Sequence, residues 1–126
     1  MPRVVHFEIQ ADDPERAANF YRNVFDWKIE KWKGPIDYWM IMTGEGVGID
    51  GGLVKRPVDL KAKGNINAFV CTIDVSDVDE YLHVVQANKG TVERPKEAIP
   101  GVGWLAYLRD TEGNLFGIMK SDKNAK

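Results

Sequence analysis

The first strand-like stretch of the sequence reads Val4-Val5-His6-Phe7-Glu8-Ile9. Successive side chains of a strand point to opposite faces, so Val5, Phe7 and Ile9 share one face. The other face carries His6 and Glu8, two side chains that can accept or release protons near neutral pH when their surroundings shift their pKa. The stretch therefore predicts a strand with an apolar core side and a chemically active side.

A helix is expected directly after this strand, from about residue 13 to residue 25. Asp12 and Glu15 are residue types that satisfy free amide groups at a helix start, and Pro14 suits the first turn. Apolar side chains then recur at spacings of three and four, which predicts one stripe that packs on the apolar strand face. That stripe comprises Pro14, Ala17, Ala18, Tyr21, Val24 and Phe25.

The same pattern returns 64 residues later. A strand is expected at Ala68–Ile73, and Ser76 with Asp79 forms a weaker version of the same helix start. The helix that follows should stop at Asn88-Lys89-Gly90. Its apolar residues repeat the earlier spacing, which indicates a duplicated structural unit: Val78, Tyr81, Leu82 and Val85.

Three short apolar runs separated by turn residues follow each helix, so each half reads β-α-β-β-β. The runs lie at 27–32, 38–42 and 47–55 in the first half and at 91–94, 104–108 and 115–120 in the second. We expect one domain of two modules, at about 3–56 and 66–121, with a charged linker at 57–65 and a solvated tail at 121–126. The loop at 95–103 should lie at the rim of any cavity, either gating it or simply connecting two strands.

Composition narrows the function classes. The 126 residues carry 17 basic and 19 acidic side chains, for a net charge of −2, so no positive field favours nucleic acid as a partner. The lone Cys71 cannot form an internal disulfide, and no apolar run approaches the roughly 20 residues of a membrane helix. The opening residues lack a secretory signal, so we expect a cytoplasmic protein without a membrane partner.

Two motifs add a family resemblance. Asp-x-x-x-Ala-x-x-Phe-Tyr at 13–21 and Asp-x-x-Gly-Asn-x-Phe-Gly at 110–117, with the paired modules, resemble the glyoxalase, bleomycin-resistance and dioxygenase superfamily, also called the vicinal oxygen chelate proteins. The stretch at 99–107 resembles the glyoxalase-like branch related to lactoylglutathione lyase. The resemblance implies an α+β fold with an open, curved, eight-stranded mixed sheet, a small-molecule ligand and a homodimer. Asp26 departs from the glycine usual there, but Asp tolerates the left-handed conformation.

In metal-dependent members of that family, four inward side chains meet a divalent ion. The resemblance carries those positions over to His6, Gly52, Val70 and Gly117. Only His6 has a lone pair to donate, whereas a catalytic ion needs about three donors. We therefore expect no metal and no other cofactor, and an ion held by His6 and Glu8 is the alternative.

Small residues at inward positions predict a cavity in the sheet, because they leave volume at its centre. The residues expected to line it are Trp39, Met40, Gly52, Val70, Trp104, Gly117 and Met119. Tyr38 could take the place of Trp39, because the sequence does not determine which of the two faces inward. Aromatic residues in a small β-rich chain can equally be ordinary core, so this lining is a hypothesis.

Three functions fit these observations. The preferred one is a protein that binds a small apolar or aromatic molecule without a metal, and either sequesters it or acts on it with His6 and Glu8 as catalytic residues. The second is a metal-dependent lyase, isomerase or dioxygenase of glyoxalase type. The third is a dimeric structural or interaction domain without catalysis. The sequence does not decide whether the protein is an enzyme.

Overall fold

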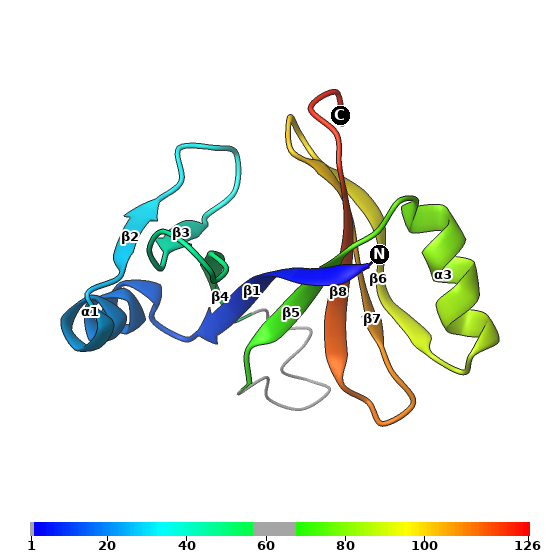
Figure 1. Cartoon of the computed structure of the whole chain (residues 1–126), viewed down its shortest axis with the longest axis horizontal. Coiled ribbons are helices and arrows are strands. Elements are labelled where there is room, and N and C mark those ends of the chain that lie inside the picture. The colour runs from blue at the N-terminus through cyan, green and yellow to red at the C-terminus, as the bar shows by residue number, and fades with distance from the viewer. Residues whose placement is uncertain (1, 57–67) are drawn as a thin grey trace. The chain divides into compact units, whose positions relative to one another are not determined.

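The computed structural model describes residues 2–56 and 68–126 of the chain (Figure 1). The predicted linker at 57–65 lies outside the described residues. The chain divides into two compact units, His6–Phe69 and Val70–Lys126, and the residues before His6 belong to the second of them. Each unit is described by itself below.

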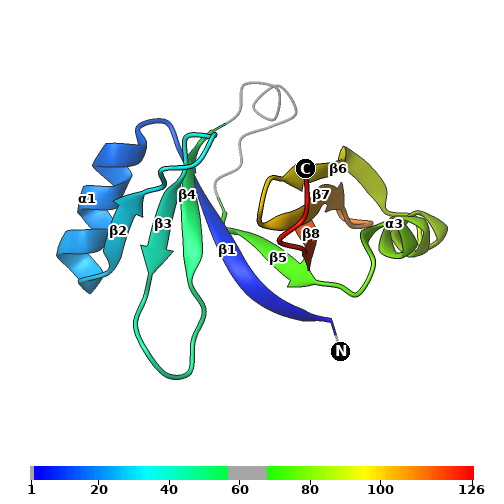
Figure 2. The same cartoon turned by 90° about the horizontal axis from the view of Figure 1, so that it is seen from above.

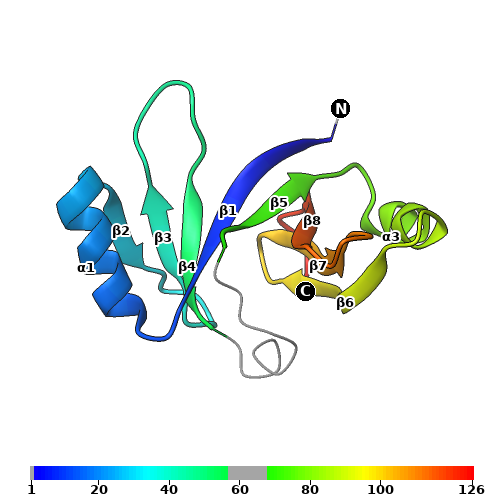
Figure 3. The ribbon, with the colours of Figure 1, turned by 90° about the horizontal axis from the view of Figure 1, so that it is seen from below.

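The first module has the predicted order of elements. It comprises β1 (Arg3–Ala11), α1 (Pro14–Phe25), β2 (Lys28–Lys31), β3 (Trp39–Met42) and β4 (Gly51–Lys55). In hydrogen-bonding order its strands run β2-β3-β4-β1, with β1 parallel to β4 and the other pairs antiparallel. Within this module α1 lies beside β2 in each view (Figures 2 and 3).

The second module repeats this arrangement. It comprises β5 (Val70–Asp74), α3 (Val78–Ala87), β6 (Thr91–Ile99), β7 (Gly103–Arg109) and β8 (Leu115–Ser121). Its strands run β5-β8-β7-β6, with β5 parallel to β8 and the other pairs antiparallel. The prediction of an α+β fold with two β-α-β-β-β modules and a mixed eight-stranded sheet is therefore confirmed.

Each module has its own apolar core between its helix and its strands. Removing these side chains from water is the main favourable term in folding. The first core contains Phe7, Ile9, Ala11, Ala18, Ile29, Ile41 and Leu53. The second contains Val75, Val78, Ala106, Leu108 and Ile118.

The two helix starts differ from the prediction by one residue each. Asp13, not Asp12, accepts the Arg16 amide at 3.1 Å, and Asp77, not Ser76, accepts the Glu80 amide at 3.2 Å. An N-cap residue must hold an extended backbone while its carboxylate reaches the third helical amide, and the second residue of each polar pair meets that condition. The predicted left-handed conformation of Asp26 is confirmed, with φ of 59°.

Two loop predictions were wrong. The expected loop at 95–103 is mostly strand, because β6 continues to Ile99. Pro95 fits there because β6 pairs only with β7 in its module, next to a register shift, and an edge strand tolerates a missing N–H. The expected solvated tail is also anchored, since Ala125 is 2% exposed and its carbonyl accepts the Gly101 amide at 3.1 Å.

Neither helix in the described part of the chain is long and apolar enough to span a membrane.

Candidate active face of the first module

His6 and Glu8 lie on the face of β1 that points away from α1. Phe7, Ile9 and Ala11 alternate with them and belong to the core on the helix side. Glu8 is a buried carboxylate, 8% exposed, and stands opposite Gly52 in the parallel pair of β1 and β4. A carboxylate buried at this level is costly to keep charged unless neighbouring groups stabilise it, so the position is chemically distinctive.

Tyr38 joins these two residues from the start of β3. Its hydroxyl and His6 Nε2 are 2.8 Å apart, and the two rings stack with centroids 6.4 Å apart at an angle of 15°. The phenol lies directly over Gly52, where a Cβ atom would overlap the ring. Gly52 was expected to leave open volume, but the structure fills that volume with Tyr38.

Trp39 explains why Tyr38 faces inward. The indole of Trp39 packs against the first core, and its Nε1 donates to a carboxylate oxygen of Glu15 on α1 at 3.0 Å. Arg22 donates to the other Glu15 oxygen at 3.0 Å, and these two hydrogen bonds lower the pKa of the Glu15 carboxyl. Because neighbouring residues of a strand point to opposite faces, fixing Trp39 on the helix side directs Tyr38 to the other side.

The predicted inward position of Trp39 is therefore wrong, and Tyr38, the alternative, takes it. Met40 lies opposite Gly52 in the antiparallel pair of β3 and β4, on the same face as Glu8, and is 36% exposed. The first module thus brings together His6, Glu8, Tyr38, Met40 and Gly52. We call this set the active face.

The environment sets the protonation of the hydrogen-bonded pair. Burial lowers the pKa of His6, and the nearby Asp50 carboxylate opposes that shift in part. Burial raises the pKa of Tyr38, and the charge of Glu8 raises it further. A neutral imidazole and a protonated phenol follow at neutral pH, and the tautomer of His6 decides which of the two groups donates in their hydrogen bond. Asp50 is held by the Thr43 amide, which donates to it at 2.9 Å.

The second module has the same geometry with different chemistry. Thr72 stands opposite Gly117 in the parallel pair of β5 and β8, as Glu8 does opposite Gly52. A Cβ atom at Gly117 would lie 3.1 Å from Thr72 Oγ1 and 3.4 Å from a ring carbon of Tyr107. Val70, at the position equivalent to His6, is 2% exposed. This face therefore carries no proton-transfer group at the positions of His6 and Glu8.

The remaining predicted cavity residues fall on two sides of the second module. Val70, Gly117 and Met119 lie on the face opposite α3, because they alternate with core positions. Trp104 lies on the helix side, where it packs against the second core and its Nε1 donates to Asp122 at 3.0 Å. The inward placement predicted for Trp104 is wrong, for the same reason as that of Trp39: a helix-side partner fixes its indole.

The donor set does not fit the family's divalent ion. Of the four positions carried over from metal-dependent members, only His6 ends in a donor atom. Within residues 2–56 and 68–126, no three His, Cys, Asp or Glu side chains are grouped so that they could hold a metal ion. Two imidazoles with a carboxylate, or a comparable trio, are needed to displace the hydration shell of a transition metal.

Sequence reasoning missed Asp50 and Tyr107. Asp50 follows a glycine-rich loop and Tyr107 lies in an apolar run, so neither stands out by residue type or by spacing. Tyr38 was not missed, since the sequence analysis gave it as the alternative to Trp39. Tyr107 meets Gly117 only through the pairing of β7 with β8 in the folded chain.

Comparisons with known proteins agree with this architecture. The Glyoxalase/Bleomycin resistance protein/Dioxygenase superfamily profile matches residues 3–118. A glyoxylase-like domain-containing protein from Didymella fabae is 29% identical over 116 residues, covering 88% of each chain. A hypothetical protein from Bacillus halodurans aligns with a TM-score of 0.71 at 16% identity, covering 99% of this chain and 98% of the other.

A methylmalonyl-CoA epimerase from Mycobacterium tuberculosis aligns with a TM-score of 0.69 at 13% identity, covering 94% of this chain and 87% of the other. Likenesses at this identity establish the fold alone. The sequence profile covers both modules, including the active face. The chain therefore belongs to the Glyoxalase/Bleomycin resistance protein/Dioxygenase superfamily.

Proposed function

We propose that this chain binds a small apolar or aromatic molecule at the active face, without a metal ion, and that His6 exchanges a proton with it. The observation that carries the proposal is the hydrogen bond between Tyr38 and a neutral His6 beside the buried Glu8. The proposal is supported by the small-molecule ligands of superfamily members and by the position of this pair beside a buried carboxylate.

The surroundings suit a largely apolar ligand. Met40 presents a flexible thioether on this face, and Trp32 contacts the edge of the Tyr38 ring with centroids 6.3 Å apart. Sites for small molecules combine apolar walls with a few polar groups that fix orientation. Here the hydroxyl of Tyr38 and the imidazole of His6 would supply the orienting hydrogen bonds.

The proton chemistry follows from the two pKa directions. In the tautomer that carries its proton on Nδ1, the lone pair of His6 Nε2 accepts the Tyr38 hydroxyl and becomes free when that hydroxyl turns away. A ligand oxygen that accepts the Tyr38 proton in a hydrogen bond would release Nε2, which could then act as a general base on the same ligand. Glu8, on the same strand face, would stabilise the imidazolium that results.

The competing function is a metal-dependent lyase, isomerase or dioxygenase of glyoxalase type. It requires donors that the four carried-over positions do not supply, apart from His6. The likeness to methylmalonyl-CoA epimerase does not bring that enzyme's substrate to this chain, because the identity is 13%. Metal independence is accordingly part of the proposal and is tested with it.

The experiment is a screen of small aromatic and apolar compounds against protein treated with a chelator. Hits from thermal shift are mapped by the NMR signals of the His6 imidazole and the Met40 methyl group. Binding should move both signals, and Tyr38→Phe and Glu8→Gln should each weaken it about tenfold, the value of one lost hydrogen bond to a charged or buried partner. His83→Gln, at an exposed histidine on α3, is the matched control and should leave binding unchanged.

Two results would overturn the proposal. One is a transition metal that co-purifies at about one ion per chain and disappears in His6→Ala, which would favour the metal-dependent function. The other is a screen without a single compound that moves the His6 or Met40 signals, which would favour the interaction domain.

Assembly and location remain predictions. We propose a homodimer, as the family resemblance implies, and light scattering on the purified chain measures it directly. The proposed cytoplasmic location is the expectation drawn from the sequence above and is tested by fractionating the cells that produce the protein.

A further inference from the structure

The connection between β3 and β4 projects beyond the strands of the first module (Figures 2 and 3). We call residues 43–50 the β3–β4 loop. Its tip is apolar and bare, since Val47 is fully exposed and Ile49 is 38% exposed. In the described part of the chain, no hydrogen bond or ion pair ties residues 44–48 to another segment. The tip is therefore held only through its two ends.

Glycines flank this tip on both sides. Gly44, Gly46 and Gly48 have φ values of 141°, 88° and 151°, a region that other residues rarely adopt. A Cβ atom at any of the three would meet no other atom within 4 Å, so close packing does not require glycine there. The glycines give the backbone freedom to change conformation, which suits hinge positions.

The base of the loop is fixed and lies beside His6. The Thr43 amide donates to an Asp50 carboxylate oxygen at 2.9 Å, and the Thr43 hydroxyl donates to the same oxygen at 3.3 Å. Asp50 precedes Gly51, which pairs with Phe7 in the parallel pair of β1 and β4, so Asp50 and His6 are neighbours across the two strands. Burial lowers the pKa of His6, and the charge of Asp50 opposes that shift, so the loop base and the site are linked electrostatically.

The tip is long enough to cover this site. The stretch from Val47 to Asp50 spans at most about 10 Å when extended, and neighbouring strands are about 4.8 Å apart. A bend at Gly48 therefore brings Val47 over His6. The opposite face of the sheet is occupied by α1 and the first core, so the loop has room on the active face alone.

We infer that the β3–β4 loop is a lid that closes on a ligand bound at the active face. The inference rests on the proposed function, since a lid has a role only where a ligand binds. In the closed state Val47 lies against the apolar part of the ligand, next to Met40, and shields the hydrogen bond between Tyr38 and His6 from water. Burial of the valine favours closure, and excluding water strengthens the hydrogen bonds inside the site.

Disulfide trapping tests closure without any ligand. Val47→Cys is combined with Met40→Cys on the active face, in the full chain with Cys71→Ser to remove the native thiol. A disulfide needs Cα atoms within about 7 Å of each other, so it forms when the tip folds onto the face. The matched control combines Val47→Cys with Lys31→Cys, because Lys31 stands beside Trp39 on the opposite face.

Both partner positions are exposed, so both pairs of variants should fold and present their thiols alike. With diamide as the oxidant, the disulfide to residue 40 should form about tenfold faster than the disulfide to residue 31, because closure brings only residue 40 within reach. Equal rates, or no disulfide to residue 40, would overturn the lid.

Acetophenone, an aromatic ketone, tests the link between the lid and ligand binding. Titrated into the full chain, it should move the NMR signals of the His6 imidazole together with those of the Met40 and Val47 methyl groups. If the His6 and Met40 signals move while those of Val47 stay, the lid is overturned and the proposed function stands.

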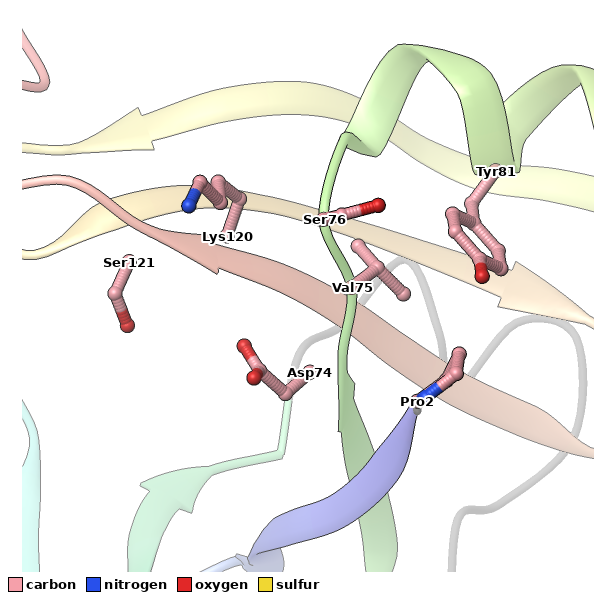
Figure 4. A pocket seen from close by; sticks show the side chains of 7 residues that line it. All are labelled: Pro2, Asp74, Val75, Ser76, Tyr81, Lys120 and Ser121. Atoms are coloured by element: carbon pink, nitrogen blue, oxygen red, sulfur yellow. The ribbon is translucent and has the colours of Figure 1, made fainter.

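The second module supplies the reference for this titration. It contains a pocket of about 390 Å³, lined in part by Val75, Ser76 and Tyr81 (Figure 4). None of its lining residues belongs to the active face. Movement confined to the Ser76 and Tyr81 signals would place acetophenone in this pocket and contradict the proposed function, and the disulfide rates would still decide whether the lid closes.

Discussion

In the first module Glu8 faces Gly52 across a parallel strand pair, and in the second Thr72 faces Gly117 in the same register. A tyrosine lies against each glycine, Tyr38 in one module and Tyr107 in the other. Two residues before the register pair, the first module has His6 and the second has Val70. The backbone repeats while the side chains do not, which teaches that a duplicated framework can keep its glycines for packing and confine its ionisable side chains at these positions to one copy.

The largest expected effect concerns the cores behind the two faces. Leu53→Ala and Leu108→Ala each remove a fully buried side chain, so each should lower the free energy of unfolding by about 2–5 kcal/mol. Urea unfolding followed by circular dichroism measures both. Similar losses of unfolding free energy would show that the two cores are equivalent although the faces in front of them differ. A loss below about 1 kcal/mol at either site would contradict that equivalence.

The next effect separates the two glycines. Gly52→Ala forces the Tyr38 ring off its position and should cost about 1–3 kcal/mol of unfolding free energy. Gly117→Ala brings its new atom to 3.1 Å from Thr72 Oγ1, a contact that a small adjustment relieves. Its net change should stay within about 1 kcal/mol, because alanine also reduces the entropy of the unfolded chain. Equal losses of unfolding free energy in the two variants would show that the position of the Tyr38 ring does not require a glycine at residue 52.

A smaller effect tests the hydrogen bond that only the first module has. Tyr38→Phe keeps the ring and removes the hydroxyl that is hydrogen-bonded to His6 Nε2, so the unfolding free energy should fall by about 1 kcal/mol. Tyr21→Phe is the control, because the Tyr21 ring stacks on Trp27 and phenylalanine preserves that contact. The idea fails if the two variants are indistinguishable.

The smallest effect is the dependence of stability on pH. Burial lowers the pKa of His6 in the folded chain, so below its unfolded pKa of about 6.5 the unfolded chain binds a proton that the folded chain does not. The contribution of His6 is therefore fully present above that pH and is lost as the pH falls towards the folded pKa. His6→Gln should remove this part of the acid destabilisation, which denaturant titrations at a series of pH values would detect.

That experiment has a clear contrary outcome. If His6→Gln loses as much stability between neutral and mildly acidic pH as the unaltered chain, then His6 is not the group whose protonation the fold resists. The second module has Val70 at the equivalent position, so Val70→Ala should leave the pH dependence as it is.

The sequence alone was enough to determine the two modules, their helices and the face that carries His6 and Glu8. These features follow from local periodicity. Side chains alternate between the two faces of a strand, and side chains three or four residues apart share one face of a helix, whatever lies nearby. The repeat at 64 residues could be read for the same reason, whereas the expectations for Asp26 and for the four metal positions came from the family resemblance.

Tertiary structure decided which member of each adjacent pair faces inward. Trp39 and Trp104 are on the helix sides because Glu15 and Asp122 accept hydrogen bonds from their indoles. Those partners are 24 and 18 residues away along the chain, so no local pattern indicates them. Tyr38 reaches His6 across 32 residues for the same reason. Side-chain alternation supplies two possible registers, and only long-range contacts select one.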